Sequence, residues 1–265
     1  MKNRILSCLG DQYPWANHLH VFETIDSTND HLRRLADNGA PHGTAVLANH
    51  QTNGHGRRGR SFHSPEGMGV YLSILLRPAC TPDGLMHLTC ATAVAMCDAL
   101  EEAAGFRPGI KWTNDLIFGK RKLGGILTAL SLNTDGSVKH AIIGIGINCL
   151  QRTDDFPEDI RDMAASLSMI SEKPVDPAPV AAAMLQHLQK MDTVLLSEKD
   201  TILKQYTLDC KTIGQDIVLV RGDEKRYGHA LDIDADGGLI VKFESGEIET
   251  VNSGEVSVRG MYGYL

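Results

Sequence analysis

Seven consecutive residues, Gly54–Arg60, contain three glycines and three arginines, and they constrain the fold more than any other stretch. Glycine loses more backbone entropy on ordering than any other residue, so this run fits neither a helix nor a strand. The flanking segments, residues 43–52 and 68–76, read as strands. We therefore expect a mobile loop at a sheet edge, above a possible pocket, whose N–H and guanidinium groups close over a polyanion.

Two other roles suit such a loop: a basic surface segment and a patch that binds nucleic acid. The formal net charge of −7 over 265 residues argues against a protein that lies on nucleic acid. Hydrophobic residues at 42% and charged residues at 22% describe a globular protein with a real core. The N-terminal apolar run is too short for a signal peptide, and no stretch approaches the ~20 apolar residues of a membrane helix. Six cysteines without a CxxC pair or metal-ligand spacing predict reduced, mostly buried thiols in a cytoplasmic protein.

The pattern up to residue 212 predicts a domain of mixed α/β class. Asp26–Asn29 are good N-cap residues, and they separate a strand from a helix. The expected helices cover residues 28–38 and 84–104 and parts of 156–210, with Val180–Leu196 as the longest. Besides the two strands at the loop, we expect strands at residues 20–24, 110–118, 123–132 and 138–148, the middle two joined by a basic turn.

The pattern changes beyond Gly214. Short strands separated by turns rich in glycine and aspartate are expected at residues 216–221, 227–233, 239–243, 247–251 and 256–259. About fifty residues of meandering short strands indicate a small β-barrel. We expect two domains, residues 1–212 and 213–265, which pack directly because no flexible linker separates them.

Several polar stretches have both a functional and a purely structural interpretation. Ser27–Thr28 are good helix caps, although a helix N-terminus also offers free N–H groups to a ligand. Asn114–Asp115 suit a turn, and Lys120–Lys122 suit a solvated hairpin tip. Gly124–Gly125 within a strand suggest the close approach of another group to the backbone. Gly144–Asn148 leave one strand face bare, which suits a ligand floor or a β-bulge.

Four blocks of the sequence occur in a fixed order. They are Asp26-Ser-Thr-Asn29; Gln51-Thr-x-Gly54-x-Gly-Arg57-x-Gly-Arg60; Lys111-Trp-x-Asn114-Asp115 with Arg121-Lys122-Leu-x-Gly125; and Gly144-x-Gly-x-Asn148. Together they strongly resemble the biotin–protein ligases, also called biotin–[acetyl-CoA-carboxylase] ligases, over about residues 20–259. The resemblance implies an α/β (α+β) catalytic domain of the biotin/lipoate ligase type, with a mixed β-sheet, flanking helices and a C-terminal SH3-like β-barrel. Because the first block begins at residue 26, we expect a monofunctional ligase without the N-terminal helix-turn-helix domain of repressor members.

The resemblance also implies a two-step reaction that uses biotin, ATP and Mg²⁺. The carboxylate of biotin attacks the α-phosphate of ATP, which gives biotinyl-5′-AMP and pyrophosphate. A lysine of a biotin carboxyl carrier protein then attacks this mixed anhydride and releases AMP. Fixed cations favour the first step because two anions approach each other. The implied partner is the carrier protein, with neither nucleic acid nor a membrane. The sequence leaves a homodimer open, for which the barrel or an exposed strand near Val138–Ile143 could each serve as the interface.

By resemblance, Lys122 and Arg57 are the catalytic residues, and Asp115 is the carboxylate linked to Mg²⁺. The implied biotin-binding residues are Ser27, Thr28, Asn29, Gln51, Gly54, His55, Arg57, Tyr71, Lys122, Gly125 and Gly144. The implied ATP-binding residues are Arg58, Arg60, Phe62, Asn114 and Asn148. A loop that orders over the anhydride would exclude water, which gives the loop glycines a use.

The sequence departs from the family pattern at three positions. His55 replaces the usual arginine, which exchanges a permanent charge for a group that titrates near neutrality. Thr113 stands where proline is usual, and Gly124 where alanine is common. Three alternatives remain: a lipoate–protein ligase, which would lack the second and third blocks; a nucleic-acid-binding module; and an inactive carrier-binding protein, which the presence of Arg57, Asp115 and Lys122 disfavours.

Overall fold

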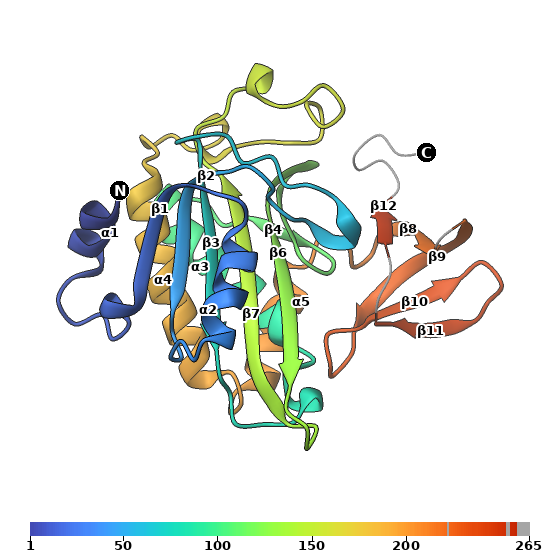
Figure 1. The fold of residues 1–265 in the computed structure, drawn as a ribbon. Helices are drawn as coiled ribbons and strands as arrows, with labels where there is room; N and C mark the ends of the chain where they lie inside the picture. Colours follow the sequence, from blue (N-terminus) through green and yellow to red (C-terminus); the bar gives the residue numbers. More distant parts are fainter. Residues whose placement is uncertain (222, 253–254, 259–265) are drawn as a thin grey trace.

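A mixed seven-stranded sheet forms the centre of the larger unit in the computed structural model, which describes residues 1–221, 223–252 and 255–258 (Figure 1). Its strand order is β1-β2-β3-β7-β6-β5-β4. The strands are β1 (Leu19–Ile25), β2 (Ala45–Gln51), β3 (Gly69–Leu76), β4 (Gly109–Lys111), β5 (Asp115–Phe118), β6 (Arg121–Leu132) and β7 (Val138–Asn148). β1 and β2 are parallel, and the other neighbours are antiparallel. The predicted mixed sheet is confirmed.

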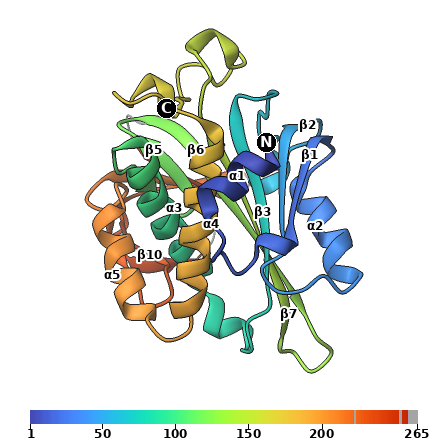
Figure 2. The ribbon, with the colours of Figure 1, turned by 90° about the vertical axis from the view of Figure 1, so that its left-hand side faces the viewer.

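Helices cover both faces of this sheet (Figure 2). They are α1 (Lys2–Leu9), α2 (Thr28–Asp37), α3 (Leu88–Ala104), α4 (Pro177–Val194) and α5 (Lys199–Asp209). α3 and α4 pack together on one face, where most of the hydrophobic core lies, and α1 packs on α4. α2 lies alone on the other face, where Leu32 and Ala36 pack against Val46, Leu75 and Ile142. Covered on both sides, β3 is buried along its whole length.

Some predicted boundaries are wrong for reasons visible in the chain. The predicted helix at 84–104 begins only at Leu88, because Pro82–Leu85 form a separate 3₁₀ turn. Residues 156–176 hold only a short 3₁₀ turn at Leu167–Met169, so the predicted helical stretch begins at Pro177. Proline at the first turn of a helix loses no hydrogen bond, so Pro177 starts α4 instead of interrupting it. The predicted strand at 110–118 is two strands, β4 and β5.

The C-terminal unit is an antiparallel five-stranded sheet with the order β11-β10-β9-β8-β12. Its strands are β8 (Asp216–Arg221), β9 (Glu224–Ile233), β10 (Leu239–Phe243), β11 (Ile248–Val251) and β12 (Glu255–Val258). These match the five predicted short strands and confirm the small β-unit, and Figure 1 shows it beside the larger sheet. Of the predicted last strand, Arg259 lies outside the described residues.

Contacts on both sides of residue 212 fix how the two units meet. Cys210 forms a β-bridge with Ile110, and the Thr212 hydroxyl accepts a hydrogen bond from the Trp112 N–H at 2.9 Å. The next residues, beginning with Gly214, bond instead to β9. We therefore propose a domain boundary at 212/213. The buried Trp112 also reaches across it, because its Nε1–H donates to the Gly237 carbonyl at 2.9 Å.

Trp112→Phe is expected to loosen this contact. The substitution removes a buried indole donor and leaves the Gly237 carbonyl without it, which costs about 1–2 kcal/mol of unfolding free energy. Urea unfolding followed by circular dichroism measures the loss. Trp15→Phe is the matched control, since Trp15 is only half-buried and lies away from the domain contact. Equal losses in the two variants would argue against a special role for the Trp112–Gly237 bond.

Candidate functional site

The register of β3, β7, β6 and β5 builds a trough in the sheet face that α2 partly covers. One row of paired residues runs Tyr71, Gly146, Gly125 and Asp115. The next row on the same face runs Ser73, Gly144 and Leu127, because side chains two apart on a strand share a face. Three glycines therefore leave the floor bare between polar groups at the two ends. Of the stretch Gly144–Asn148, for which a ligand floor was predicted, Gly144, Ile145 and Gly146 line this hollow.

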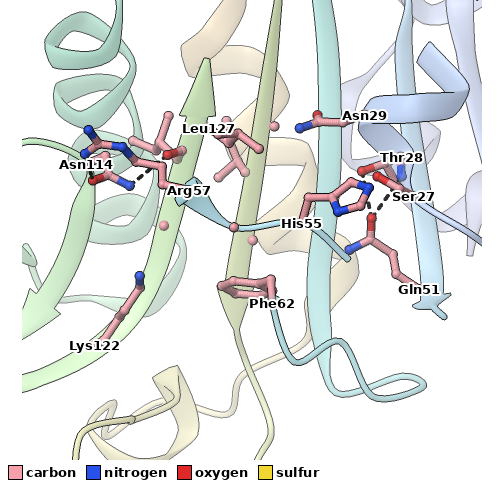
Figure 3. Close-up of a pocket in the computed structure, with 16 residues that line it drawn as sticks. Ser27, Thr28, Asn29, Gln51, His55, Arg57, Phe62, Asn114, Lys122 and Leu127 are labelled. Carbon is pink, nitrogen blue, oxygen red and sulfur yellow. Dashed lines mark hydrogen bonds between the residues drawn. The ribbon is translucent and has the colours of Figure 1, made fainter. Parts of the chain in front are cut away.

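This hollow is a pocket with ≈ 470 Å³ of space not filled by protein, including its open mouth. The predicted site residues that line it are Ser27, Thr28, Asn29, Gln51, His55, Arg57, Phe62, Asn114, Lys122, Gly125 and Gly144. They come from the N-terminus of α2, the end of β2, the glycine loop and the segment after it, the β4–β5 turn, β6 and β7, and the fold brings them together (Figure 3). Gly56, Ile126, Leu127, Ile145 and Gly146 also line the pocket, although no role was predicted for them.

One end of the pocket is a hydrogen-bonded cluster at the N-terminus of α2. Ser27 caps the helix, and its Oγ accepts from the Asp30 N–H at 3.4 Å. Gln51 Oε1 accepts from both the N–H and the hydroxyl of Thr28, at 2.9 and 3.1 Å. The Gln51 amide then donates to Ser64 Oγ at 3.0 Å. These partners fix which way the Gln51 amide points, so the cluster presents donors and acceptors in a set order.

Ser73 belongs to the same cluster, and sequence reasoning missed it. It is fully buried on β3, and its Oγ lies 2.8 Å from Thr28 Oγ1 and 2.5 Å from Asn29 Oδ1. In the sequence it sits within an apolar run, Val70–Leu76, where a lone serine reads as tolerated core. Its spacing could have revealed it, because Ser73 lies two positions from the predicted site residue Tyr71 and therefore on the same strand face. Ser73 orients Asn29, whose amide lies over Gly144.

Ser73→Ala is expected to raise the KM for the pocket's ligand about 5- to 10-fold, since it frees the Thr28 and Asn29 side chains to rotate. The fold should survive, because alanine fills most of the same volume. Steady-state kinetics or calorimetric titration measures the change. Ser137→Ala, in the exposed turn before β7, serves as the control. An unchanged KM would mean that Thr28 and Asn29 do not need Ser73.

The glycine loop crosses above the trough. It folds on itself through a bridge between His55 and Ser61, a bond from Gly56 N–H to the Arg60 carbonyl at 2.6 Å, and one from Phe62 N–H to the Gly54 carbonyl at 2.9 Å. The expected mobile loop is therefore a hydrogen-bonded loop in this structure, with Arg57–Gly59 in a 3₁₀ turn. Its shape explains how one short segment places both a histidine and an arginine over the pocket.

The other end of the pocket is cationic. Lys122 Nζ lies 2.6 Å from Asp115 Oδ1, close beside Gly125. Arg57 donates to Asn114 Oδ1 at 2.7 Å, and the Asn114 amide donates to the Ile126 carbonyl at 2.9 Å. Asn114 thereby ties the loop to β6. Lys122 is paired with a carboxylate and Arg57 donates to a neutral amide, an arrangement that attracts a second anion.

Phe62 forms one wall of the trough. Its ring lies over Gly146, where any β-carbon would come within 2.4 Å of it. Tyr71 packs against the ring edge-to-face at a centroid distance of 6.3 Å and donates its hydroxyl to the Pro65 carbonyl at 2.9 Å. Burial raises the pKa of Tyr71, so it stays a neutral donor. Tyr71 therefore supports Phe62 and does not itself line the pocket.

Several other predicted residues lie beside the pocket and not in its lining. Gly54 is buried where a β-carbon would come within 2.8 Å of the Phe62 carbonyl. Asn148 shares the strand face of Gly144 and Gly146 but does not line the pocket, and its amide donates to the Ala165 carbonyl at 3.0 Å. Asp115 stands behind Lys122, and Arg60 is exposed on the loop. The Arg58 side chain lies outside the described part of the structure.

The cysteines take no part in this site. All six are free, and Cys90, Cys97, Cys149 and Cys210 are buried, which agrees with the predicted reduced thiols. Burial raises the pKa of the Cys149 thiol to about 12, so it stays protonated and unreactive. Among the described residues, no group of three or more His, Cys, Asp and Glu side chains could hold a metal. Within the same residues, no helix is long and apolar enough to cross a membrane.

Comparison with known proteins gives consistent matches. The Biotin/lipoate A/B protein ligase family matches residues 21–148, and the Biotin protein ligase C terminal domain matches residues 212–259. The Bifunctional ligase/repressor BirA of Bacillus spizizenii is 37% identical over 91% of this chain and 74% of its own length. A Biotin--[acetyl-CoA-carboxylase] ligase of Paracoccus denitrificans is 29% identical over 89% and 98%.

A solved structure agrees with these sequence matches. The biotin protein ligase of Aquifex aeolicus, in complex with biotin and ATP, superposes with a TM-score of 0.75 at 31% identity, covering 91% of this chain and 98% of that one. The match extends through both sheets, so the trough and the C-terminal unit are each accounted for. With its ordered sequence blocks, its pocket and these relatives, the chain belongs to the biotin protein ligase family.

Proposed function

We propose that this chain is an ATP-dependent biotin–protein ligase, which forms biotinyl-5′-AMP and transfers biotin to a lysine of a biotin carboxyl carrier protein. One observation carries the proposal: a bare glycine floor runs from a neutral polar cluster to a pair of cations. The groups of biotin follow the same order, because a neutral polar ureido ring is joined by an apolar chain to a negatively charged carboxylate. A single small molecule thus satisfies both ends.

The neutral end is assigned to the ureido ring. Ser27, Thr28, Asn29 and Gln51 supply ordered donors and acceptors there, and Gly144 keeps the floor open beneath Asn29. Leu127 offers the apolar contact that an aliphatic chain needs. Gly54 and Tyr71 act indirectly, Gly54 by allowing the close approach to Phe62 and Ser64, and Tyr71 by supporting the Phe62 ring.

The cationic end is assigned to the reacting atoms. Lys122 and Arg57 stabilise the charge that grows as the biotin carboxylate attacks the α-phosphate, and again as the carrier lysine attacks the anhydride. Phe62 and Asn114, which line the pocket, are assigned to the nucleotide. Arg58 and Arg60 are assigned to the phosphates through their place in the loop. Asn148 is assigned to the rim of the nucleotide side, through the segment at Ala165 that it holds.

Mg²⁺ fits this donor set only in part. Asp115 is a single carboxylate already paired with Lys122, and Mg²⁺ bound to nucleotides takes most of its ligands from phosphates and water. One carboxylate is enough for such an ion, and we assign that role to Asp115. The ion would neutralise the triphosphate, while Lys122 and Arg57 act at the carboxylate.

The macromolecular partner is the carrier protein, and we propose no role for nucleic acid, given the net charge of −7. A cytoplasmic reaction agrees with six free thiols. A homodimer remains part of the proposal, and light scattering coupled to size-exclusion chromatography tests it by the mass in solution.

Pyrophosphate exchange tests the function without a carrier. The enzyme is mixed with ATP, Mg²⁺, labelled pyrophosphate and either biotin or lipoate, and label is followed into ATP. We expect exchange that depends on biotin. Exchange with lipoate alone would make the chain a lipoate–protein ligase, the sister activity of the matched family. With neither acid active, binding of a generic oligonucleotide at moderate salt tests the nucleic-acid alternative.

A further inference from the structure

A histidine–carboxylate contact joins the glycine loop to α2. His55 Nε2 lies 2.7 Å from Asp30 Oδ2, a short separation typical of a charge-assisted hydrogen bond. His55 is among the expected biotin-binding residues, whereas Asp30 has no assigned role. In Figure 3 the His55 ring lies beside the Thr28 and Gln51 cluster, on the α2 side of the pocket. The family resemblance does not account for this pair, because arginine usually occupies the position of His55.

Asp30 is a fixed anion. It lies in the first turn of α2, where the helix dipole favours a negative charge, and its N–H is capped by Ser27. Its two carboxylate oxygens have different partners, since Oδ1 accepts from Arg33 at 2.8 Å and Oδ2 faces His55. Arg33 therefore sets the rotation of the carboxylate, and the second oxygen points at the loop. The Asp30 carboxylate is therefore already oriented toward His55 when the loop closes.

The loop is held on both sides of the pocket. The backbone bonds between Gly54 and Phe62 give the loop its shape but do not reach either side. His55 reaches α2 on one side, and Arg57 reaches Asn114 on the other. If Arg57 turns to the carboxylate and phosphate during the reaction, its bond to Asn114 is exchanged at that moment. The His55–Asp30 contact can persist throughout.

We propose that Asp30 is a positioning residue that, through His55, holds the Gly54–Arg60 loop over the pocket and so slows the escape of biotin and of the activated intermediate. The identity of these ligands rests on the proposed function, whereas the contact does not. Asp30 acts through the loop and not on the reacting atoms. Its loss should therefore raise the KM for biotin and the release rate of biotinyl-AMP more than it lowers kcat.

The kinetic test compares Asp30→Ala, His55→Ala and the double variant. We expect each single variant to raise the KM and the release rate about 5- to 10-fold, as for a partly exposed charged hydrogen bond. The double variant should be no worse than either, because both remove one shared contact. Asp192→Ala is the matched control, since it breaks another His–Asp pair, with His42 at 2.9 Å, away from the pocket.

A second readout does not depend on ligase activity. Trypsin needs an extended, flexible backbone, so faster cleavage after Arg57, Arg58 or Arg60 reports loop opening, and mass spectrometry of the ligand-free chain follows those fragments. We expect cleavage about 5- to 10-fold faster in Asp30→Ala, and wild-type rates in Asp192→Ala. If Asp30→Ala does not fold, Asp30→Asn replaces it, with a smaller acceleration expected because the amide still accepts a hydrogen bond.

The outcomes separate the two proposals. The positioning role is wrong if trypsin cleaves a folded Asp30 variant at the wild-type rate. It is also wrong if the KM increases of Asp30→Ala and His55→Ala multiply in the double variant. If the wild-type chain shows no biotin-dependent exchange, the proposed function is wrong. If loop cleavage is nevertheless faster in Asp30→Ala, the positioning role of the Asp30–His55 contact still holds.

Discussion

Lys122→Ala is expected to slow biotin-dependent pyrophosphate exchange by about 10²- to 10³-fold, the usual cost of removing one group that stabilises charge in a transition state. The Lys122 ammonium lies at the cationic end of the trough, beside the glycine floor. Exchange isolates the first half-reaction, so the loss cannot be ascribed to the carrier.

The fold should be intact in this variant. The Lys122–Asp115 pair is partly exposed, and such pairs contribute about 0–1 kcal/mol to stability. Lys120→Ala, two residues away on the exposed hairpin tip, removes the same charge without touching the pocket and should exchange at the wild-type rate. Near-normal exchange by Lys122→Ala would move the chemistry to another part of the trough.

Arg57→Gly is expected to release biotinyl-AMP about 10- to 100-fold faster than the wild type, as for the loss of a charged hydrogen bond. The guanidinium holds the loop to Asn114 and faces the reacting end of the pocket. Released anhydride reacts with any exposed lysine, so bystander proteins should become biotinylated. A streptavidin blot of a mixture containing the carrier and an unrelated lysine-rich protein measures this spread.

Arg152→Gly gives the matched control for Arg57→Gly, since it also replaces a loop arginine with glycine but lies outside the pocket lining. It should label the carrier alone. If Arg57→Gly also labels only the carrier, at an unchanged rate of intermediate release, the retention role of the loop is wrong.

Most of the fold could be predicted from local patterns. The strands that flank the loop, the helix capped by Ser27 and the five short C-terminal strands all follow from periodicity and turn residues. The wrong predictions also have physical reasons. Residues 156–176 are irregular because they bond to the sheet, as when the Lys122 N–H donates to the Met163 carbonyl at 2.7 Å. Such distant partners leave no periodic trace in the sequence.

The pocket lining was largely predictable because its residues belong to recognisable blocks. What the blocks do not contain is the support behind them. Ser73 is hidden in an apolar run, and Asp30 reads as an ordinary helix residue. Tyr71 and Asn148 contact Phe62 and the Ala165 carbonyl in this structure, and their expected ligand contacts stay predictions. Register and rotamer decide these roles, and neither can be read from one sequence.

The bare floor of the trough limits how this pocket can change. Gly125, Gly144 and Gly146 already have the smallest side chain, so every substitution there fills space. A β-carbon on Gly144 would come within 2.3 Å of Asn29, and one on Gly146 within 2.4 Å of Phe62. The depth of the pocket is therefore at its maximum, and room for a bulkier biotin analogue can come only from the walls, by trimming Leu127 or Phe62.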